Sequence, residues 1–175
     1  MKNNRKQVAA LIVGAFLIGG APTATAVSNV SKVVDGDTIT MSNGEKVRLI
    51  QIDTPELASK ECYGAQAKSE LAKLLNQPGE VTLQADPKLD TIDRYGRLLR
   101  YVFIGDTNLN LKLIEVGAAA PYFYRNEKGI YAAEFLKAAQ TAQKRKLGLW
   151  AACPGTRLSP NHAVQTKVKV GVIKK

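Results

Sequence analysis

Histidine is almost absent from this sequence, and its scarcity narrows the chemistry that the protein can perform. The 175 residues contain one histidine, His162, near the C-terminal end, and two cysteines, Cys62 and Cys153. A zinc site of imidazoles and thiolates needs about four such ligands, and the most common general base is an imidazole. The composition therefore disfavours a zinc site of this kind and points to carboxylates as the acid–base groups.

The sequence also lacks an apolar run long enough to span a bilayer. Residues 8–18 are apolar, but they are well short of the roughly 20 residues that a membrane helix needs. A basic segment precedes this run, and the small residues Ala24-Thr25-Ala26 follow it, which is typical of a secretory signal peptide. With a membrane anchor as the alternative, we expect residues 1–26 to be a cleaved signal and the mature protein to be secreted or periplasmic, without stable membrane association.

The two cysteines and the charge fit such an exported chain. An even pair of cysteines outside the cell is typical of a disulfide, so we expect Cys62 to pair with Cys153, with two free thiols as the alternative. The charge of the chain is strongly positive, with a formal net value of +10. Removing residues 1–26 takes away three positive charges and no acids, which leaves a net charge of +7. A basic chain suits a polyanionic partner such as nucleic acid, although solubility alone is the simpler explanation.

Hydrophobic patterning predicts one α+β domain. Residues 30–53 indicate three strands, the last at Val47 to Asp53, with turns at Asp35-Gly36 and Ser42 to Glu45. A helix over residues 65–76, strands over 81–83 and 98–104, a helix capped by Asn108 and a helix from Tyr131 that ends at Gly148 follow. A meander of three strands, then a helix, then two strands describes a five-stranded OB-type β-barrel with about three α-helices. We assign the domain to residues 28–153 and expect 154–175 to form a basic, partly disordered tail, in which 168–173 could add an edge strand.

Polar groups interrupt the predicted strands at three places, residues 35–38, 48 with 53–56, and 93–97. Acids without histidine or thiolate suit a hard cation such as calcium or magnesium. Asp37 and Asp53 come from neighbouring strands, so we predict that they share one ion. The Thr54 carbonyl is a further candidate ligand because a residue before proline is held extended. Glu56, behind that proline, would lie near the ion without binding it.

A metal ion, a free carboxylate and two arginines are the groups that phosphodiester hydrolysis requires. The ion polarises a phosphoryl oxygen, Glu56 takes a proton from water, and Arg48 and Arg97 neutralise charge on the other oxygens. Arginine suits this task because its planar fork matches a phosphate. Strict alternation places Arg48 and Asp53 on opposite faces of a flat strand, so the strand must bend or bulge before Asp53.

These residues resemble a known family. The stretches "DGDT" at 35–38, "RLIQIDTPE" at 48–56, "DRYGR" at 93–97 and "KRKLGLW" at 144–150 are similar, in order, to the motifs of the thermonuclease family, whose type member is staphylococcal nuclease. The resemblance covers roughly residues 30–151. Four ordered motifs are far more specific than one.

The resemblance implies a role for each matching residue. Calcium would be bound by Asp37, Asp53 and the Thr54 carbonyl, with Glu56 as general base and Arg48 and Arg97 on the phosphate. Substrate contacts would come from a group on two segments: Arg94, where the type member has a lysine, Tyr95, Tyr122 and Tyr124. The family cleaves DNA and RNA to leave 3′-phosphates, and we expect a monomer. The segment 57–62 is shorter than the corresponding mobile loop of the type member, which also lacks the cysteine pair.

Two other classes of function compete with a nuclease. A non-catalytic OB-type nucleic-acid-binding protein would use the same basic and aromatic surface, but acids repel phosphate unless a cation intervenes. A secreted inhibitor or adhesion module held by one disulfide would leave the clustered charges unexplained. The tyrosines also have a simpler explanation, because tyrosines at such spacing are often core residues with a bonded hydroxyl.

Overall fold

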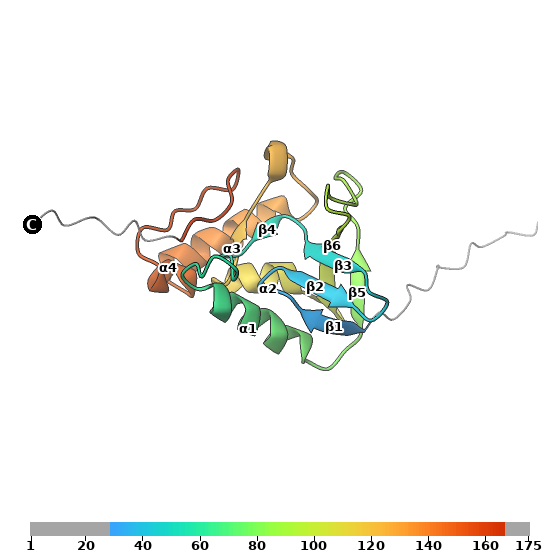
Figure 1. The fold of residues 1–175 in the computed structure, drawn as a ribbon. Coiled ribbons are helices and arrows are strands. Elements are labelled where there is room, and N and C mark those ends of the chain that lie inside the picture. Colours follow the sequence, from blue (N-terminus) through green and yellow to red (C-terminus); the bar gives the residue numbers. More distant parts are fainter. Residues whose placement is uncertain (1–28, 167–175) are drawn as a thin grey trace, which may run out of the picture.

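The protein is described by a computed structural model that covers residues 29–166, in which a curled sheet packs against helices (Figure 1). The sheet order is β1-β2-β3-β6-β5, with β7 paired to β6. Strands β1 to β3 form an antiparallel meander, and β3 pairs in parallel with β6. This confirms the expected α+β class. The bounds are β1 Val30–Val33, β2 Thr38–Met41, β3 Lys46–Leu49, β5 Val81–Gln84, β6 Leu98–Ile104 and β7 Thr107–Asn108.

The helices largely follow the sequence pattern. They are α1 Gly64–Leu75, α2 Leu109–Glu115, α3 Ala132–Lys144 and a single turn that was not expected, α4 Leu149–Ala152. As predicted, Asn108 caps α2, because its side chain accepts a hydrogen bond from the N–H of Leu111 at 3.2 Å. Gly148 does not end α3. Lys146 ends it instead, by taking the left-handed conformation at φ +52°.

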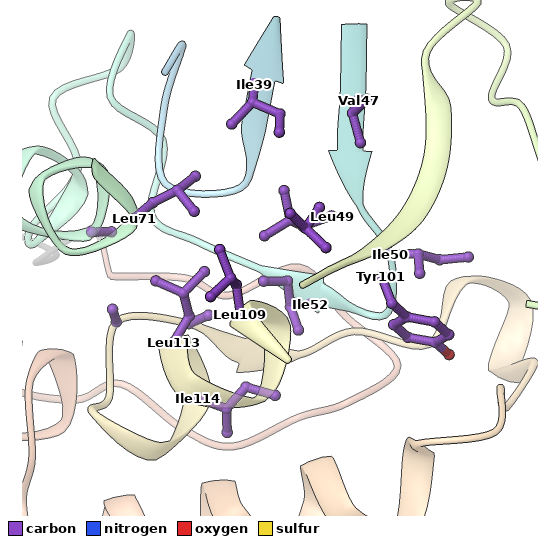
Figure 2. Close-up of a cluster of buried hydrophobic side chains, with 14 of the residues drawn as sticks. Ile39, Val47, Leu49, Ile50, Ile52, Leu71, Tyr101, Leu109, Leu113 and Ile114 are labelled. Atoms are coloured by element: carbon purple, nitrogen blue, oxygen red, sulfur yellow. The ribbon is translucent and has the colours of Figure 1, made fainter. Parts of the chain in front are cut away.

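The core lies between the concave face of the sheet and the helices, where side chains from strands β2 and β3 meet those of α1 and α2 (Figure 2). The fully buried side chains include Ile39, Leu49, Leu71, Leu113 and Ile114. Each such side chain contributes about 2 kcal/mol by leaving water. This packing gives the strand ends a rigid base.

The predicted third strand, Val47 to Asp53, is wrong in its continuity. Strand β3 ends at Leu49, and the chain resumes as β4 (Ile52–Asp53), which pairs with β8 (Ala120–Pro121) in a separate two-stranded sheet. Between them Gln51 has φ +65°, a left-handed conformation that is rare for a residue other than glycine. The chain bends at this residue. Such a bend was expected, because Arg48 and Asp53 would lie on opposite faces of a flat strand.

Only part of the predicted terminal segments lies within the residues that the structure describes. The expected signal peptide, residues 1–26, and the possible edge strand at 168–173 lie outside the described residues. The first part of the expected tail, 154–166, is described and folds back, so that Val164 is 8% exposed. Within 29–166 the structure contains no helix with the length and apolar character needed to cross a bilayer.

Candidate active site

Arg48 and Asp53 lie side by side because of the bend at Gln51. Nη2 of Arg48 is 2.9 Å from Oδ1 of Asp53, and Nη1 is 2.9 Å from Oδ2 of Asp37. One guanidinium thus bridges two carboxylates from different strand ends. Its remaining contacts are with the carbonyls of Leu49 and Ile52 at 3.1 and 3.0 Å, which hold the bend itself.

Thr54 holds the carboxylate of Asp37. Its backbone N–H and its hydroxyl both donate to Oδ2 of Asp37 at 2.9 Å. The hydroxyl contact was not predicted from the sequence, which drew attention only to the carbonyl. A Cβ at Gly36 would lie 2.7 Å from the Thr54 hydroxyl, so glycine is needed here for close approach. We call Asp37, Arg48, Asp53 and Thr54 the carboxylate cluster.

The carboxylate cluster carries more negative than positive charge. Asp37 and Asp53 are buried, at 5% and 8% exposure, and they share one guanidinium. Burial raises the pKa of both carboxyls; Arg48 opposes this rise, and the charge of nearby Asp35 adds to it. The pKa of Glu56 is also raised, first by partial burial of its carboxyl and then by repulsion from Asp35 and Asp53. Such an excess of negative charge favours a cation.

The donor set fits a hard divalent ion. No group of three or more His, Cys, Asp or Glu residues lies close enough to hold a metal within the part of the chain that the structure describes. The candidate ligands are the two carboxylates that Arg48 bridges, Asp37 and Asp53, and the carbonyl of Thr54 stays a predicted third ligand. An all-oxygen set completed by water is what calcium or magnesium accepts. An ion would share both carboxylates with Arg48.

Glu56 follows directly on this cluster and is exposed. Its backbone is held by Glu61, whose carboxylate accepts from the N–H of Glu56 at 3.1 Å and whose N–H donates to the carbonyl of Glu56 at 3.0 Å. One residue later Cys62 forms the expected disulfide with Cys153, with Cα atoms 5.8 Å apart. The short loop behind Glu56 is thus closed at both ends.

Arg97 and Arg48 line one pocket of about 390 Å³. They come together because β3 runs parallel to β6 with Arg48 opposite Leu99, next but one to Arg97. Asp93 holds Arg97 through Nε at 2.6 Å, which leaves the fork of terminal nitrogens as the part that matches a phosphate. Burial pushes the pKa of Asp93 up, but N–H groups of Arg97 and Tyr95 outweigh it and lower the pKa overall.

The predicted substrate residues line the same pocket, which we call the tyrosine pocket: Arg94, Tyr95, Tyr122 and Tyr124. Tyr95 and Tyr124 are 67% and 54% exposed, so they are not core residues. Arg94 and Arg97 stack on the Tyr95 ring at 4.7 and 5.5 Å from its centroid. Asp37, Asp53 and Glu56 are not among the lining residues, and Arg48 alone of the carboxylate cluster belongs to both regions.

Two buried side chains that the sequence did not suggest anchor the segments of the tyrosine pocket. Gln51 donates to the carbonyl of Glu127 at 2.9 Å and accepts from the N–H of Gly129 at 2.8 Å. Asp86 accepts from the Tyr101 hydroxyl and from the N–H of Ile130, at 2.7 and 2.8 Å. A polar residue inside an apolar strand, as Gln51 is, was the one signal that could have revealed the first anchor.

Comparison with known proteins identifies the family of the chain. The model of the family described as staphylococcal nuclease homologue matches residues 46–152. A thermonuclease of Staphylococcus intermedius is 38% identical over 130 residues, 69% of this chain and 74% of that protein. A thermonuclease of Staphylococcus hyicus is 39% identical over 131 residues, 69% and 73% of the two chains.

A third relative is longer than this chain. The SPbeta prophage-derived endonuclease YokF of Bacillus subtilis is 35% identical over 126 residues, which are 68% of this chain but 42% of that protein. The match therefore spans about three quarters of the two thermonucleases and less than half of YokF. The chain belongs to the staphylococcal nuclease family, which confirms the resemblance in the sequence and the expectation of a nuclease.

Proposed function

We propose that the protein is an exported, calcium-dependent endonuclease that hydrolyses phosphodiester bonds of DNA and RNA. The observation that carries the proposal is the position of Arg48, which bridges the buried carboxylates Asp37 and Asp53 and also lines the tyrosine pocket with Arg97. In this proposal a cation binds on the side of Arg48 that faces the two carboxylates, and a nucleotide binds on the side that lines the pocket.

In this proposal each group has one task. Calcium held by Asp37, Asp53 and the Thr54 carbonyl would polarise a phosphoryl oxygen. Glu56 takes a proton from the attacking water, and its raised pKa makes it a stronger base than an ordinary glutamate. Arg48 and Arg97 offer planar forks to the non-bridging oxygens as negative charge builds on them.

The tyrosine pocket supplies binding. The exposed rings of Tyr95 and Tyr124 offer faces on which bases stack without regard to sequence, while Arg94 adds positive charge and Tyr122 completes the wall. The 3′-phosphate products follow from the family resemblance, and the monomeric state is our expectation. They remain part of the proposal.

The competing function is non-catalytic binding of nucleic acid. The exposed tyrosines and arginines support binding as well as they support catalysis. The carboxylates distinguish the two functions: acids beside a phosphate weaken binding unless a cation offsets them, so a pure binder has no use for Asp37, Asp53 and Glu56.

A cleavage assay tests the proposal. The mature protein is incubated with single-stranded DNA and with RNA, in calcium and in chelator, and products are resolved on gels. We expect cleavage in calcium only. Glu56→Gln should lower kcat by about 10²- to 10⁴-fold, the usual contribution of a general base, with an unchanged unfolding curve, whereas Glu45→Gln, at an exposed position, should keep full activity. Calcium-independent binding of nucleic acid without cleavage would show that the protein is a non-catalytic nucleic-acid-binding protein.

Export has its own test. If residues 1–26 are a cleaved signal, Edman sequencing or mass spectrometry of the protein recovered outside the cytoplasm should show a chain that begins just after Ala26. Recovery of the intact N-terminus in the membrane fraction would contradict export by cleavage.

A further inference from the structure

Residues 154–166, which we call the C-terminal strap, double back onto the domain (Figure 1). The strap starts immediately after Cys153, which the disulfide fixes in place. Near its middle, the carbonyl of Pro160 accepts a hydrogen bond from the backbone N–H of Phe123 at 2.6 Å. Near its end Val164 is buried. These contacts make the strap an integral part of the domain.

Val164 connects the strap to the carboxylate cluster. Its backbone N–H donates to Oδ2 of Asp53 at 2.8 Å, a buried contact between residues 111 positions apart. Its side chain packs in a small apolar cluster with Ala120, Leu149 and Cys153. The apolar contacts hold Val164 in the domain, and the N–H is thereby directed at the carboxylate.

Asp53 consequently receives one donor on each oxygen. Nη2 of Arg48 binds Oδ1 at 2.9 Å, and the N–H of Val164 binds Oδ2. Two donors from opposite ends of the chain fix both the rotation and the plane of the carboxylate, and each oxygen still has a lone pair. Donors of this outer kind orient metal ligands, and their loss typically weakens metal binding by about 10- to 100-fold.

The chemical nature of the donor matters as much as its position. A lysine or a second arginine at this place would orient Asp53 too, but it would cancel the negative charge that attracts a cation. A backbone N–H orients the carboxylate and adds no net charge. The carboxylate cluster therefore keeps its excess of acid while one of its ligands is held in a single orientation.

We propose that the C-terminal strap is a positioning element of the nuclease site, in which the backbone N–H of Val164 holds the Asp53 carboxylate in the orientation that binds the divalent cation. This inference rests on the proposed function. The side chain of Val164 packs in the apolar cluster and its N–H contacts Asp53, so in this proposal the residue acts through Asp53.

The experiment removes the N–H and keeps the side chain of Val164. Native chemical ligation joins an N-terminal cysteine to a C-terminal thioester. A synthetic 153–175 segment that begins with Cys153 can therefore be joined to a mature chain that carries a thioester at Ala152. In this segment the α-hydroxy analogue of valine at position 164 replaces the amide N–H by an ester oxygen. Calcium affinity is measured by calorimetry without substrate, the free energy of unfolding is measured in chelator, and kcat and KM are measured in saturating calcium.

We expect the ester protein to bind calcium about 10-fold more weakly than the ligated all-amide protein. Val164→Ala, made by the same ligation, is the matched control: it loses apolar contacts but keeps the N–H, so it should unfold more easily while its calcium affinity changes less than 2-fold. If the ester protein does not refold, Val164→Pro, expressed as a complete chain, also lacks the N–H and must lose about 10-fold more calcium affinity than Val164→Ala does.

The possible results separate the strap from the proposed function. If the all-amide protein neither binds calcium nor cleaves nucleic acid, the proposed function fails and the inference fails with it. If the all-amide protein does both, and the chain without the Val164 N–H binds calcium with equal affinity, the nuclease stands and the positioning role is wrong. Equal losses of calcium affinity in the ester and Val164→Ala proteins would mean that the strap supports the site through apolar packing and not through the N–H of Val164.

Discussion

The carboxylate cluster and the tyrosine pocket share Arg48 but are built in opposite ways. Asp37 and Asp53 are 5% and 8% exposed, whereas Tyr95 and Tyr124 are 67% and 54% exposed. Partners 17 and 111 residues away in the chain hold the two carboxylates. In the pocket, by contrast, Asp93 holds Arg97 from four residues away, and each exposed ring stacks with an adjacent arginine.

This difference predicts how each region responds to mutation. In the carboxylate cluster Asp37 and Asp53 are buried, charged and dependent on Arg48, so a change there is expected to alter folding and chemistry together. Groups at the rim of the tyrosine pocket are solvated and held locally, so a change there alters substrate binding and leaves the fold intact. The two arginines offer the most direct comparison, since both are proposed to act on the same phosphate.

The largest expected effect is that of Arg48→Ala. It leaves two buried carboxylates without their shared partner, which typically costs about 3–5 kcal/mol of unfolding free energy. Arg97→Ala breaks a partly exposed pair, with side chains 27% and 15% exposed, and should cost less than about 1 kcal/mol. Both variants should lose about 10²- to 10³-fold in kcat if each arginine stabilises the transition state. Urea unfolding in chelator and steady-state kinetics measure the two quantities.

The conservative variant sharpens this comparison. Arg48→Lys keeps a positive charge between Asp37 and Asp53 but loses the fork, so it should recover part of the stability and little of the activity. Equal destabilisation by Arg48→Ala and Arg97→Ala would contradict the contrast between the two regions, and full activity of either alanine variant would remove that arginine from the mechanism.

The next effect concerns the rim of the pocket. Tyr124→Ala should raise KM for single-stranded DNA about 10-fold, since stacking of a base on an aromatic ring contributes roughly 1–3 kcal/mol. Its kcat and unfolding free energy should hardly change, because the ring is more than half exposed. Tyr124→Phe keeps the stacking face and is the matched control, with a KM near that of the unmodified protein. A fall in kcat with constant KM would place Tyr124 in the chemical step instead.

The same contrast explains which parts of the molecule could be predicted from the sequence. The main sheet strands, the three longer helices and the arginine and tyrosine positions follow from local patterns and ordered motifs, because periodicity and turn chemistry act over a few residues; the short elements β4, β7, β8 and α4 did not. The bend at Gln51 was inferred only indirectly, from the need to bring Arg48 and Asp53 together. No local rule selects glutamine for a left-handed conformation; its side-chain bonds to residues 127 and 129 accompany that choice.

The strap could not be predicted for a different physical reason. The contact to Asp53 is made by a backbone N–H, a group that every residue except proline has. The identity of Val164 carries information only about its apolar packing. A basic, weakly patterned tail therefore gave no sign that one of its amides belongs to the carboxylate cluster.

The smallest predicted effect tests how the exposed pocket is tied to the core. Asp86 is 2% exposed and begins the segment that carries Tyr95. Burial pushes its pKa up, but hydrogen bonds from the Tyr101 hydroxyl and the N–H groups of Lys88 and Ile130 outweigh this and lower the pKa. A carboxyl with a lowered pKa stabilises the fold above its unfolded pKa of about 4, and that stabilisation is lost as the pH falls through the folded value.

Asp86→Asn should therefore lower the unfolding free energy by about 1 kcal/mol at pH 7, and the difference from the unmodified protein should shrink as the pH falls below about 4, where Asp86 itself is neutral. Urea titrations from pH 7 to pH 2.5 measure this, with Asp106→Asn as the control at an exposed position. A difference that stays constant with pH would mean that shape, and not the carboxylate charge, makes Asp86 an anchor. Because the anchored segment carries Arg97 as well as Tyr95, its displacement should raise KM and lower kcat in parallel with the loss of stability.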